Sequence, residues 1–269
     1  RMFWLLLIGL AHAFGLWYGD ILNTYAICGL FLYPFRRLRA ALLIALGTAI
    51  LLIAVIARVG PPMVDTISPP SSSASASESE SRADRIWRES IRDEKSAYTG
   101  SYVDLARWRA RLNIFWHWDG CITFNFWRCG GFMLIGMGLV QLGVLSAERS
   151  SSFFWALLIA GYTAGLILFV VGFWPQLARA LGRAPDMPAE ARRILGLATW
   201  TLRYSAAAGI ALGHVAVIML LCRIRALTPI LSPLAAVGRL ALSNYLLQTL
   251  IAVLIFDGWA GAQWSKWRM

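Results

Sequence analysis

The residues best suited to chemistry lie inside apolar segments. The apolar run of residues 231–259 contains five polar side chains close together, namely Arg239, Ser243, Asn244, Tyr245 and Gln248. Placing such groups in hydrocarbon costs free energy, and in membrane proteins they often mark functional positions. At helical spacing, Asn244 and Gln248 share one face. Arg239 and Ser243 share another, which predicts a helix enclosed by other helices, and we predict that the five side chains bind a substrate.

Each of these residues also has a purely structural explanation. Asn244 and Gln248 could form hydrogen bonds to neighbouring helices. Arg239, if it lies near a helix end, could extend its guanidinium group to the lipid headgroups. Arg128 is a further polar group near the end of an apolar segment. We include it among the candidate substrate-binding residues.

His12 and Asp20 are the candidate catalytic residues. A neutral histidine inside a helix bundle can act as a general base, and an aspartate can orient a partner or bind a cation. On one regular helix the two residues lie about 12 Å apart, so their side chains are not expected to touch. The alternatives are a packing histidine and an aspartate that caps the next helix. His214, in a later apolar segment, is a comparable histidine.

Other reaction motifs are absent from the sequence. It contains no GxSxG, HExxH, P-loop or dinucleotide-binding pattern, so spacing alone names no reaction and predicts no metal site, and the cofactor stays undetermined. The four cysteines form no CxxC pair and lie in or beside apolar segments: Cys28, Cys121, Cys129 and Cys222. This placement indicates buried thiols, with neither a disulfide framework nor a zinc site.

The composition indicates a polytopic membrane protein. Hydrophobic residues make up 58% of the 269 residues and charged residues only 14%, whereas soluble domains carry about 25% charged residues. The net charge of +11 comes mostly from basic residues at the ends of apolar segments. Such residues face anionic headgroups, so we expect the lipid bilayer, and no nucleic acid, as a partner. The distribution of basic residues does not decide the orientation.

We predict an all-α transmembrane bundle of about seven spans, with a polar, partly disordered insert after the third. Residues 1–59 form three spans, and residues 60–97 a Ser-rich linker and a charged helix. Residues 98–118 form an amphipathic helix at the membrane interface, or alternatively one packed against the protein itself. Residues 119–269 form a C-terminal membrane domain of four spans. Because the chain opens inside an apolar run, we expect that part of the protein precedes it.

Two stretches together resemble a known family. One is Leu-Leu-Leu-Ile-Gly-Leu-Ala before His12, with residues 19–22 and 25–29 after it. The other is Val237–Thr249. They resemble the YeiB-like proteins of the bacterial inner membrane, whose C-terminal half is a domain of unknown function (DUF418). The resemblance implies a multi-pass protein of the inner membrane. The family's usual N-terminal spans, with an Asp-x-x-Arg-Gly motif, are absent from this chain.

That family is distantly similar to membrane acyltransferases of the heparan-glucosaminide acetyltransferase type. Those enzymes move an acyl group from cytosolic acyl-CoA to an acceptor across the membrane, using an intramembrane histidine. The resemblance thus implies an acyltransferase with acyl-CoA as donor, His12 as base and Arg239 holding the donor. The matching positions are His12, Asp20, Arg239, Asn244 and Gln248.

Two other classes of function stay open. Polar groups on internal helix faces could line the path of a small-solute transporter. The long polar insert could bind a partner protein, which would make the chain a membrane scaffold. The sequence does not decide the oligomeric state, and a homodimer is one alternative.

Overall fold

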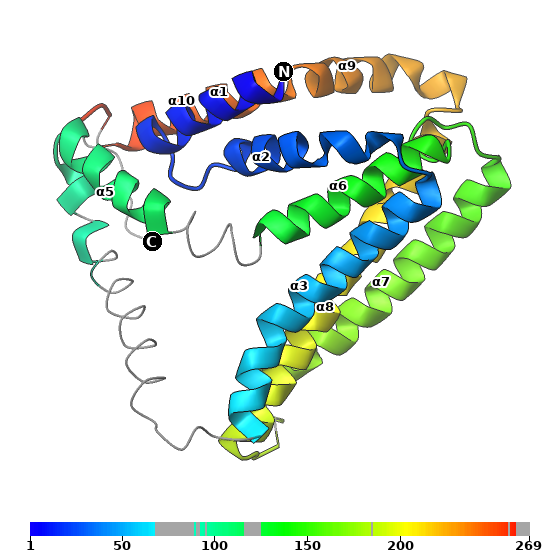
Figure 1. Cartoon of the computed structure of the whole chain (residues 1–269), viewed down its shortest axis with the longest axis horizontal. Coiled ribbons are helices and arrows are strands. Elements are labelled where there is room, and N and C mark those ends of the chain that lie inside the picture. The colour runs from blue at the N-terminus through cyan, green and yellow to red at the C-terminus, as the bar shows by residue number, and fades with distance from the viewer. Residues whose placement is uncertain are drawn as a thin grey trace.

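The computed structural model describes residues 1–67, 89, 92–94, 96–115, 125–183, 185–257 and 259–261. Within this part the chain forms helices and connecting turns and contains no strand (Figure 1). The predicted all-α class is therefore confirmed. The Ser-rich linker of residues 68–81 and Cys121 lie outside the described residues.

The helices follow one another along the chain with short connections, except around the insert. In order they are α1 (Met2–Gly15), α2 (Leu22–Leu32), the 3-10 helix η1 (Tyr33–Arg37), α3 (Ala40–Ile67), α5 (Tyr102–Phe115), α6 (Phe126–Gln141), α7 (Ser151–Ala180), α8 (Ala189–Leu221), the 3-10 helix η3 (Arg225–Leu227), α9 (Thr228–Arg239) and α10 (Ala241–Phe256). Residues 92–94 and 96–99 are also helical.

The prediction of about seven membrane spans is not confirmed. Among the described residues, two helices are long and apolar enough to cross a membrane, α7 and α8. The number rises to three if the bent pair of residues 225–239 and 241–256 counts as one span. The apolar helix α1 has only 14 residues and α6 only 16, and a single crossing takes about 20.

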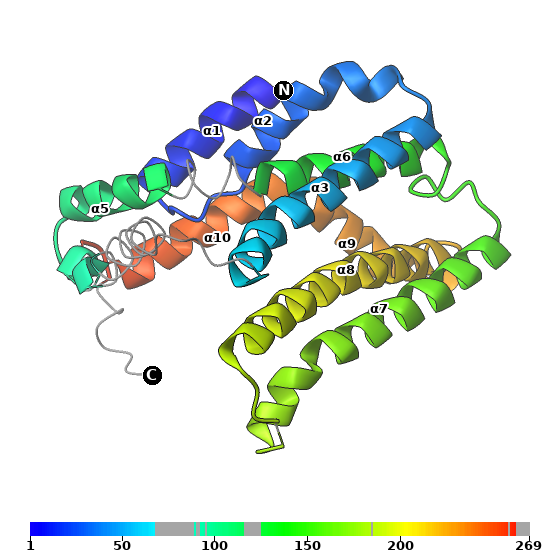
Figure 2. The ribbon, with the colours of Figure 1, turned by 60° about the horizontal axis from the view of Figure 1, so that its bottom comes forward.

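A short connection joins α7 to α8. α7 continues past Pro175 to Ala180, and α8 begins at Ala189, so only residues 181–188 connect the two helices. The two helices lie side by side (Figure 2). Glycines of α7 (Gly161, Gly165) face glycines of α8 (Gly209, Gly213), and this small-residue contact lets the backbones approach closely.

The C-terminal apolar run is two helices and not one. α9 ends at Arg239 and α10 begins at Ala241, with a bend of 71° between them. The expectation that Arg239 and Ser243 share one helix face is therefore wrong. Gly238 lowers the helix propensity just before the bend, and Leu240 N–H donates to the carbonyls of both Ala236 and Val237, which tightens the last turn of α9.

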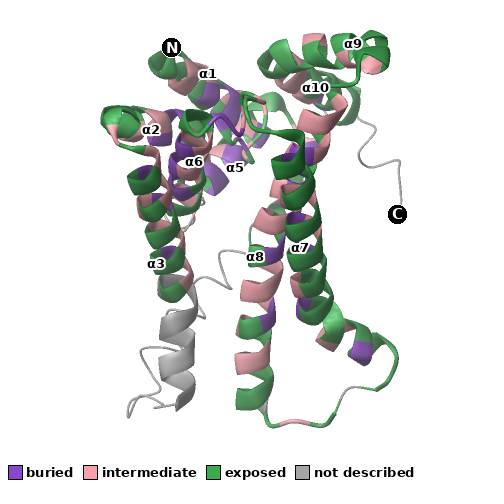
Figure 3. Ribbon diagram, turned by 90° about the vertical axis from the view of Figure 1, so that its right-hand side faces the viewer, coloured by how far each residue is buried: buried purple, intermediate pink, exposed green. Residues whose placement is uncertain are grey.

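The predicted amphipathic helix corresponds to α5, and it packs against the protein. Leu105, Trp108 and Leu112 form a buried cluster with residues 97–98. Buried residues gather where α1, α2 and α5 approach one another (Figure 3). Of the two alternatives for this segment, packing against the protein is observed. The depth of α5 relative to a bilayer stays a prediction. The division of the chain into four parts also stays a prediction.

Candidate functional site

His12 and Asp20 are in contact, contrary to the expectation from helical spacing. α1 ends at Gly15, and the turn of residues 16–21 brings Asp20 back toward the helix. His12 Nδ1 lies 2.9 Å from Asp20 Oδ1, and both side chains are almost completely buried. The approach is not that of a hydrogen bond, and neither ring nitrogen has a hydrogen-bond partner in the described part of the chain.

Asp20 also joins two further helices. Its Oδ2 accepts a hydrogen bond from Asn23 N–H at 3.0 Å, so it caps the first turn of α2, as the structural alternative predicted. Its Oδ1 accepts a hydrogen bond from the Tyr245 hydroxyl of α10 at 3.2 Å. The rings of His12 and Tyr245 lie 5.0 Å apart. One carboxylate thus connects α1, α2 and α10, and we call His12, Asp20 and Tyr245 the polar cluster.

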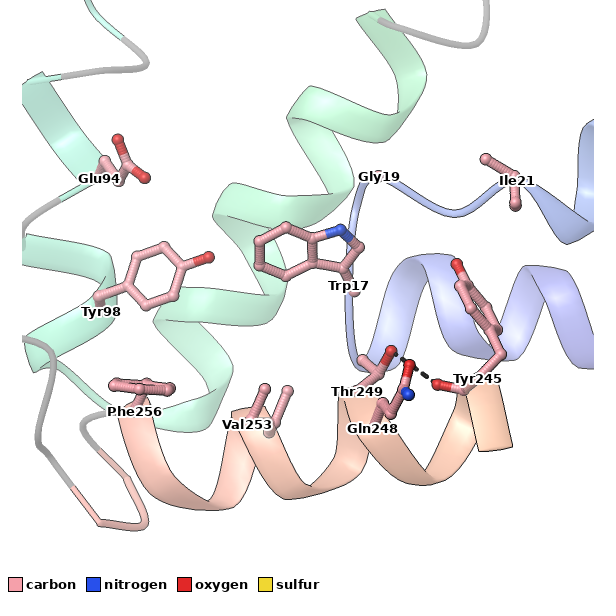
Figure 4. Close-up of a pocket in the computed structure, with 11 residues that line it drawn as sticks. Trp17, Gly19, Ile21, Glu94, Tyr98, Tyr245, Gln248, Thr249, Val253 and Phe256 are labelled. Carbon is pink, nitrogen blue, oxygen red and sulfur yellow. Dashed lines mark hydrogen bonds between the residues drawn. The ribbon is translucent and has the colours of Figure 1, made fainter. Parts of the chain in front are cut away.

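A cavity of about 610 Å³ begins at Tyr245 and follows α10. Figure 4 shows Tyr245, Thr249, Val253 and Phe256 along one side of it. Trp17 faces them from the turn between α1 and α2. The lining is mainly apolar, with polar groups from Glu94, Tyr98, Tyr245, Gln248 and Thr249. The cavity therefore fits a ligand that is mostly hydrocarbon.

Tyr98 lines the end of this cavity that lies away from Tyr245 (Figure 4). Its ring packs edge-on against Trp108, with the centroids 5.5 Å apart. The guanidinium carbon of Arg109 stands 5.7 Å from the ring centroid. Burial raises the pKa of Tyr98 to about 12, although the nearby Arg109 lowers it in part. The Tyr98 hydroxyl is therefore neutral at physiological pH.

A second cavity of about 520 Å³ lies on another side of α10. Asn244 and Leu247 line it together with Val237 and Gly238 of α9, whereas Tyr245 and Gln248 line both cavities. Asn244 Nδ2 donates to the carbonyl of Val237 at 3.3 Å, so the predicted structural role of this amide is observed. Tyr245 and Gln248 are thus the substrate-binding candidates that the structure brings to the larger cavity.

The structure does not bring the remaining candidates to the polar cluster. Arg239 and Ser243 are exposed and line neither cavity. Arg128, at the start of α6, lies over the ring of Tyr204 of α8 at 5.9 Å. His214 is exposed, and its Nδ1 contacts the carbonyl of Ile210 in its own helix at 2.8 Å.

A buried ion pair was not anticipated from the sequence. Arg109 of α5 is completely buried, and its Nη2 donates to Asp257 Oδ2 at 2.8 Å. A signal was present, because Arg109 follows Leu105 by four residues and precedes Leu112 by three, which places it on the apolar face of the helix. Arg107 and Arg111 lie two residues away on either side, so Arg109 resembles one of several basic residues on a solvated helix face.

The described residues show no metal-binding group. They contain no cluster of His, Cys, Asp or Glu side chains that could hold a metal ion. No disulfide joins Cys28, Cys129 and Cys222. The side chains of the polar cluster are an imidazole, a carboxylate and a phenol, which are suited to hydrogen bonding and proton transfer.

Comparison with known proteins finds a family match for the C-terminal part of the chain. Residues 139–269 match a family model described as a protein of unknown function, DUF418. This range contains α7 to α10, and hence Tyr245 and Asp257, but not His12 or Asp20. No curated protein and no solved structure matches the chain. The description of this family names no acyltransferase activity, so the similarity to membrane acyltransferases stays a prediction. Together with the long apolar helices α7 and α8, this match indicates a membrane protein whose residues 139–269 are similar to the DUF418 family.

Proposed function

We propose that this is a multi-pass enzyme of the bacterial inner membrane that transfers an acyl group from acyl-CoA to a hydroxyl acceptor. The observation that carries the proposal is a buried histidine 2.9 Å from a carboxylate, with its ring 5.0 Å from that of Tyr245, which lines a largely apolar cavity. A carboxylate this close to an imidazole stabilises the imidazolium that forms when the imidazole accepts a proton. The distant resemblance to membrane acyltransferases points in the same direction.

His12 is the general base in this proposal. Its Nδ1 faces Asp20, which leaves Nε2 for the acceptor. Nε2 takes the proton of the acceptor hydroxyl as its oxygen attacks the thioester carbonyl. The carbon–sulfur bond breaks, and CoA leaves as a thiolate that takes up the proton. Tyr245 contacts His12 and lines the cavity, whereas His12 does not line it, so the proposal requires the Tyr245 side chain to turn aside when substrate enters.

The larger cavity holds the acyl chain. From Tyr245 to Phe256 it extends over about 16 Å of α10, with mainly apolar side chains along that length. Hydrocarbon gains free energy when such surfaces leave water. The donor's phosphates stay outside the cavity. The role of Arg239 in holding them remains a prediction, because this side chain lines neither cavity.

The test is thioester consumption by the full-length protein in lipid nanodiscs. Acetyl-CoA and lauroyl-CoA are supplied with a lipid extract as acceptor, and released CoA thiol is measured. We expect turnover that falls by about 10²–10⁴-fold in His12→Ala, which is the usual contribution of a general base. His214→Ala is the matched control and keeps the wild-type rate. Absence of thiol release from the wild type, or an equal rate in His12→Ala, would refute the proposal.

A small-solute transporter is the second candidate. One observation favours it: Tyr245 and Gln248 line cavities on two sides of α10, next to a helix break of 71°, and broken helices are common at transporter binding sites. Solute uptake into vesicles, lost in Gln248→Ala while no thioester is consumed, would replace the first candidate by this one. The scaffold alternative concerns the insert, most of which lies outside the described residues.

A further inference from the structure

The last turn of α1 is held by side chains of α5. A helix ends with carbonyl groups that have no partner within the helix. In α1, the carbonyl of Ala13 accepts a hydrogen bond from Asn113 Nδ2. The carbonyl of Gly15 accepts one from the Tyr102 hydroxyl at 3.2 Å and one from Arg109 Nη1 at 3.4 Å. α5 thus caps the helix from which the turn to Asp20 departs.

α5 also packs against that turn. The ring of Tyr18 lies edge-on to Trp108 of α5, with the centroids 5.5 Å apart, and the rings of Trp17 and Tyr18 are 5.2 Å apart. Trp17 in turn lines the larger cavity. The conformation of residues 16–20, which sets Asp20 against His12, therefore depends on contacts with α5 at both its start and its middle.

Arg109 connects these contacts to α10. Besides Gly15, it binds Asp257, which lies directly after the last residue of α10. Asp257 Oδ2 accepts a second hydrogen bond, from Trp259 Nε1, at 3.2 Å. A fully buried arginine is costly unless it is paired, so this contact holds α5 in one position relative to α1 and α10. These two elements carry His12 and Tyr245.

We propose that Arg109 is a positioning residue, which keeps the turn of residues 16–20 folded over His12 through its contacts with Gly15 and Asp257. α5 is then a structural part of the candidate site. This inference builds on the polar cluster of the proposed function, but it concerns the geometry of His12 and Asp20 whether or not they transfer an acyl group.

The test measures the chemical accessibility of His12. The full-length protein in nanodiscs is treated with diethyl pyrocarbonate, which modifies neutral imidazole, and modification of His12 is followed by mass spectrometry of its peptide. In the wild type, His12 is only 2% exposed, so its modification is slow. In Arg109→Ala we expect a rate about tenfold higher, because local opening of the turn becomes easier. Arg107→Ala is the matched control, since this arginine is on the same helix but 72% exposed, and it keeps the wild-type rate.

A second readout separates positioning from general loosening. Asp20→Asn removes the carboxylate next to His12 and so changes the pH profile of the modification rate. Arg109→Ala should change that profile in the same direction. Arg109→Lys should partly restore the wild-type profile, because lysine keeps the positive charge but lacks the planar guanidinium that binds Gly15 and Asp257 at once. Equal rates and profiles in wild type, Arg109→Ala and Asp257→Asn would overturn the inference. If Arg109→Ala does not fold, Asp257→Asn decides the question by the same two readouts. Neither measurement depends on acyl transfer. The proposed function can therefore fail while this inference stands, and this inference can fail while the proposed function stands.

Discussion

Replacing Gly161 by alanine tests how closely α7 and α8 pack. A Cβ atom at this position would lie 2.8 Å from the carbonyl oxygen of Gly209 and 2.9 Å from the backbone nitrogen of Gly213. Both are backbone atoms of α8, so no side-chain rotation can relieve the overlap. The two helices must move apart, which weakens contacts along the rest of their shared surface.

The size of the effect follows from two opposing contributions. Forcing an extra methyl group into a closely packed contact costs about 1–3 kcal/mol. Alanine in place of glycine within a helix returns up to about 1 kcal/mol. With the full gain from alanine, the free energy of unfolding should still fall by up to about 2 kcal/mol. Gly196 of α8 has no atom within 4 Å of its ideal Cβ position, so Gly196→Ala should instead raise the free energy of unfolding by up to about 1 kcal/mol.

The two variants carry the same chemical change, so the assay compares them directly. Wild type, Gly161→Ala and Gly196→Ala are unfolded by heating and by denaturant in the same detergent, with helicity followed by circular dichroism. We expect shifts of opposite sign. If Gly161→Ala were as stable as Gly196→Ala, the close approach of α7 and α8 described above would be wrong.

Three further predictions concern α5 and its partners. Asp257→Ala leaves Arg109 buried without its carboxylate and should lower the free energy of unfolding by about 3–5 kcal/mol. Joint replacement of Arg109 by Met and Asp257 by Leu should recover most of this loss, as a denaturant titration of wild type and the two variants would show. Tyr98 has a pKa raised to about 12 by burial. Its neutral form is therefore favoured in the folded state, and its contribution to stability, complete below pH 10, should be lost as the pH rises toward about 12. Wild type should accordingly lose more stability than Tyr98→Phe over that range in thermal melts, and parallel curves would contradict the burial of this hydroxyl. Ser101 and Asp104 form a capping pair at the start of α5, with Ser101 Oγ donating to Asp104 Oδ2 at 2.6 Å, so Ser101→Ala should cost about 1 kcal/mol in the same titration.

Much of the architecture was accessible from the sequence. The long apolar runs predicted helices in a membrane protein, because backbone groups in hydrocarbon must be satisfied within the segment. The sequence pattern also predicted an amphipathic helix within residues 98–118, and α5 there buries Leu105, Trp108 and Leu112. The candidates His12, Asp20 and Tyr245 were selected because their polarity was unusual for their surroundings. These are properties of a local stretch of chain, which a sequence displays directly.

The meeting of those candidates was decided by the tertiary structure. His12 and Asp20 touch because α1 ends at Gly15 and the chain turns back, so the assumption of one regular helix was wrong. Likewise, the bend at Leu240 separates Arg239 from α10. Tyr245 donates a hydrogen bond to Asp20, although the two residues are 225 positions apart in the sequence. Arg109 and Asp257, 148 positions apart, form a pair only because α5 packs against the ends of α1 and α10. Such contacts depend on where helices end and how they pack, and both are settled by the balance of burial and hydrogen bonding over the whole fold rather than by local sequence.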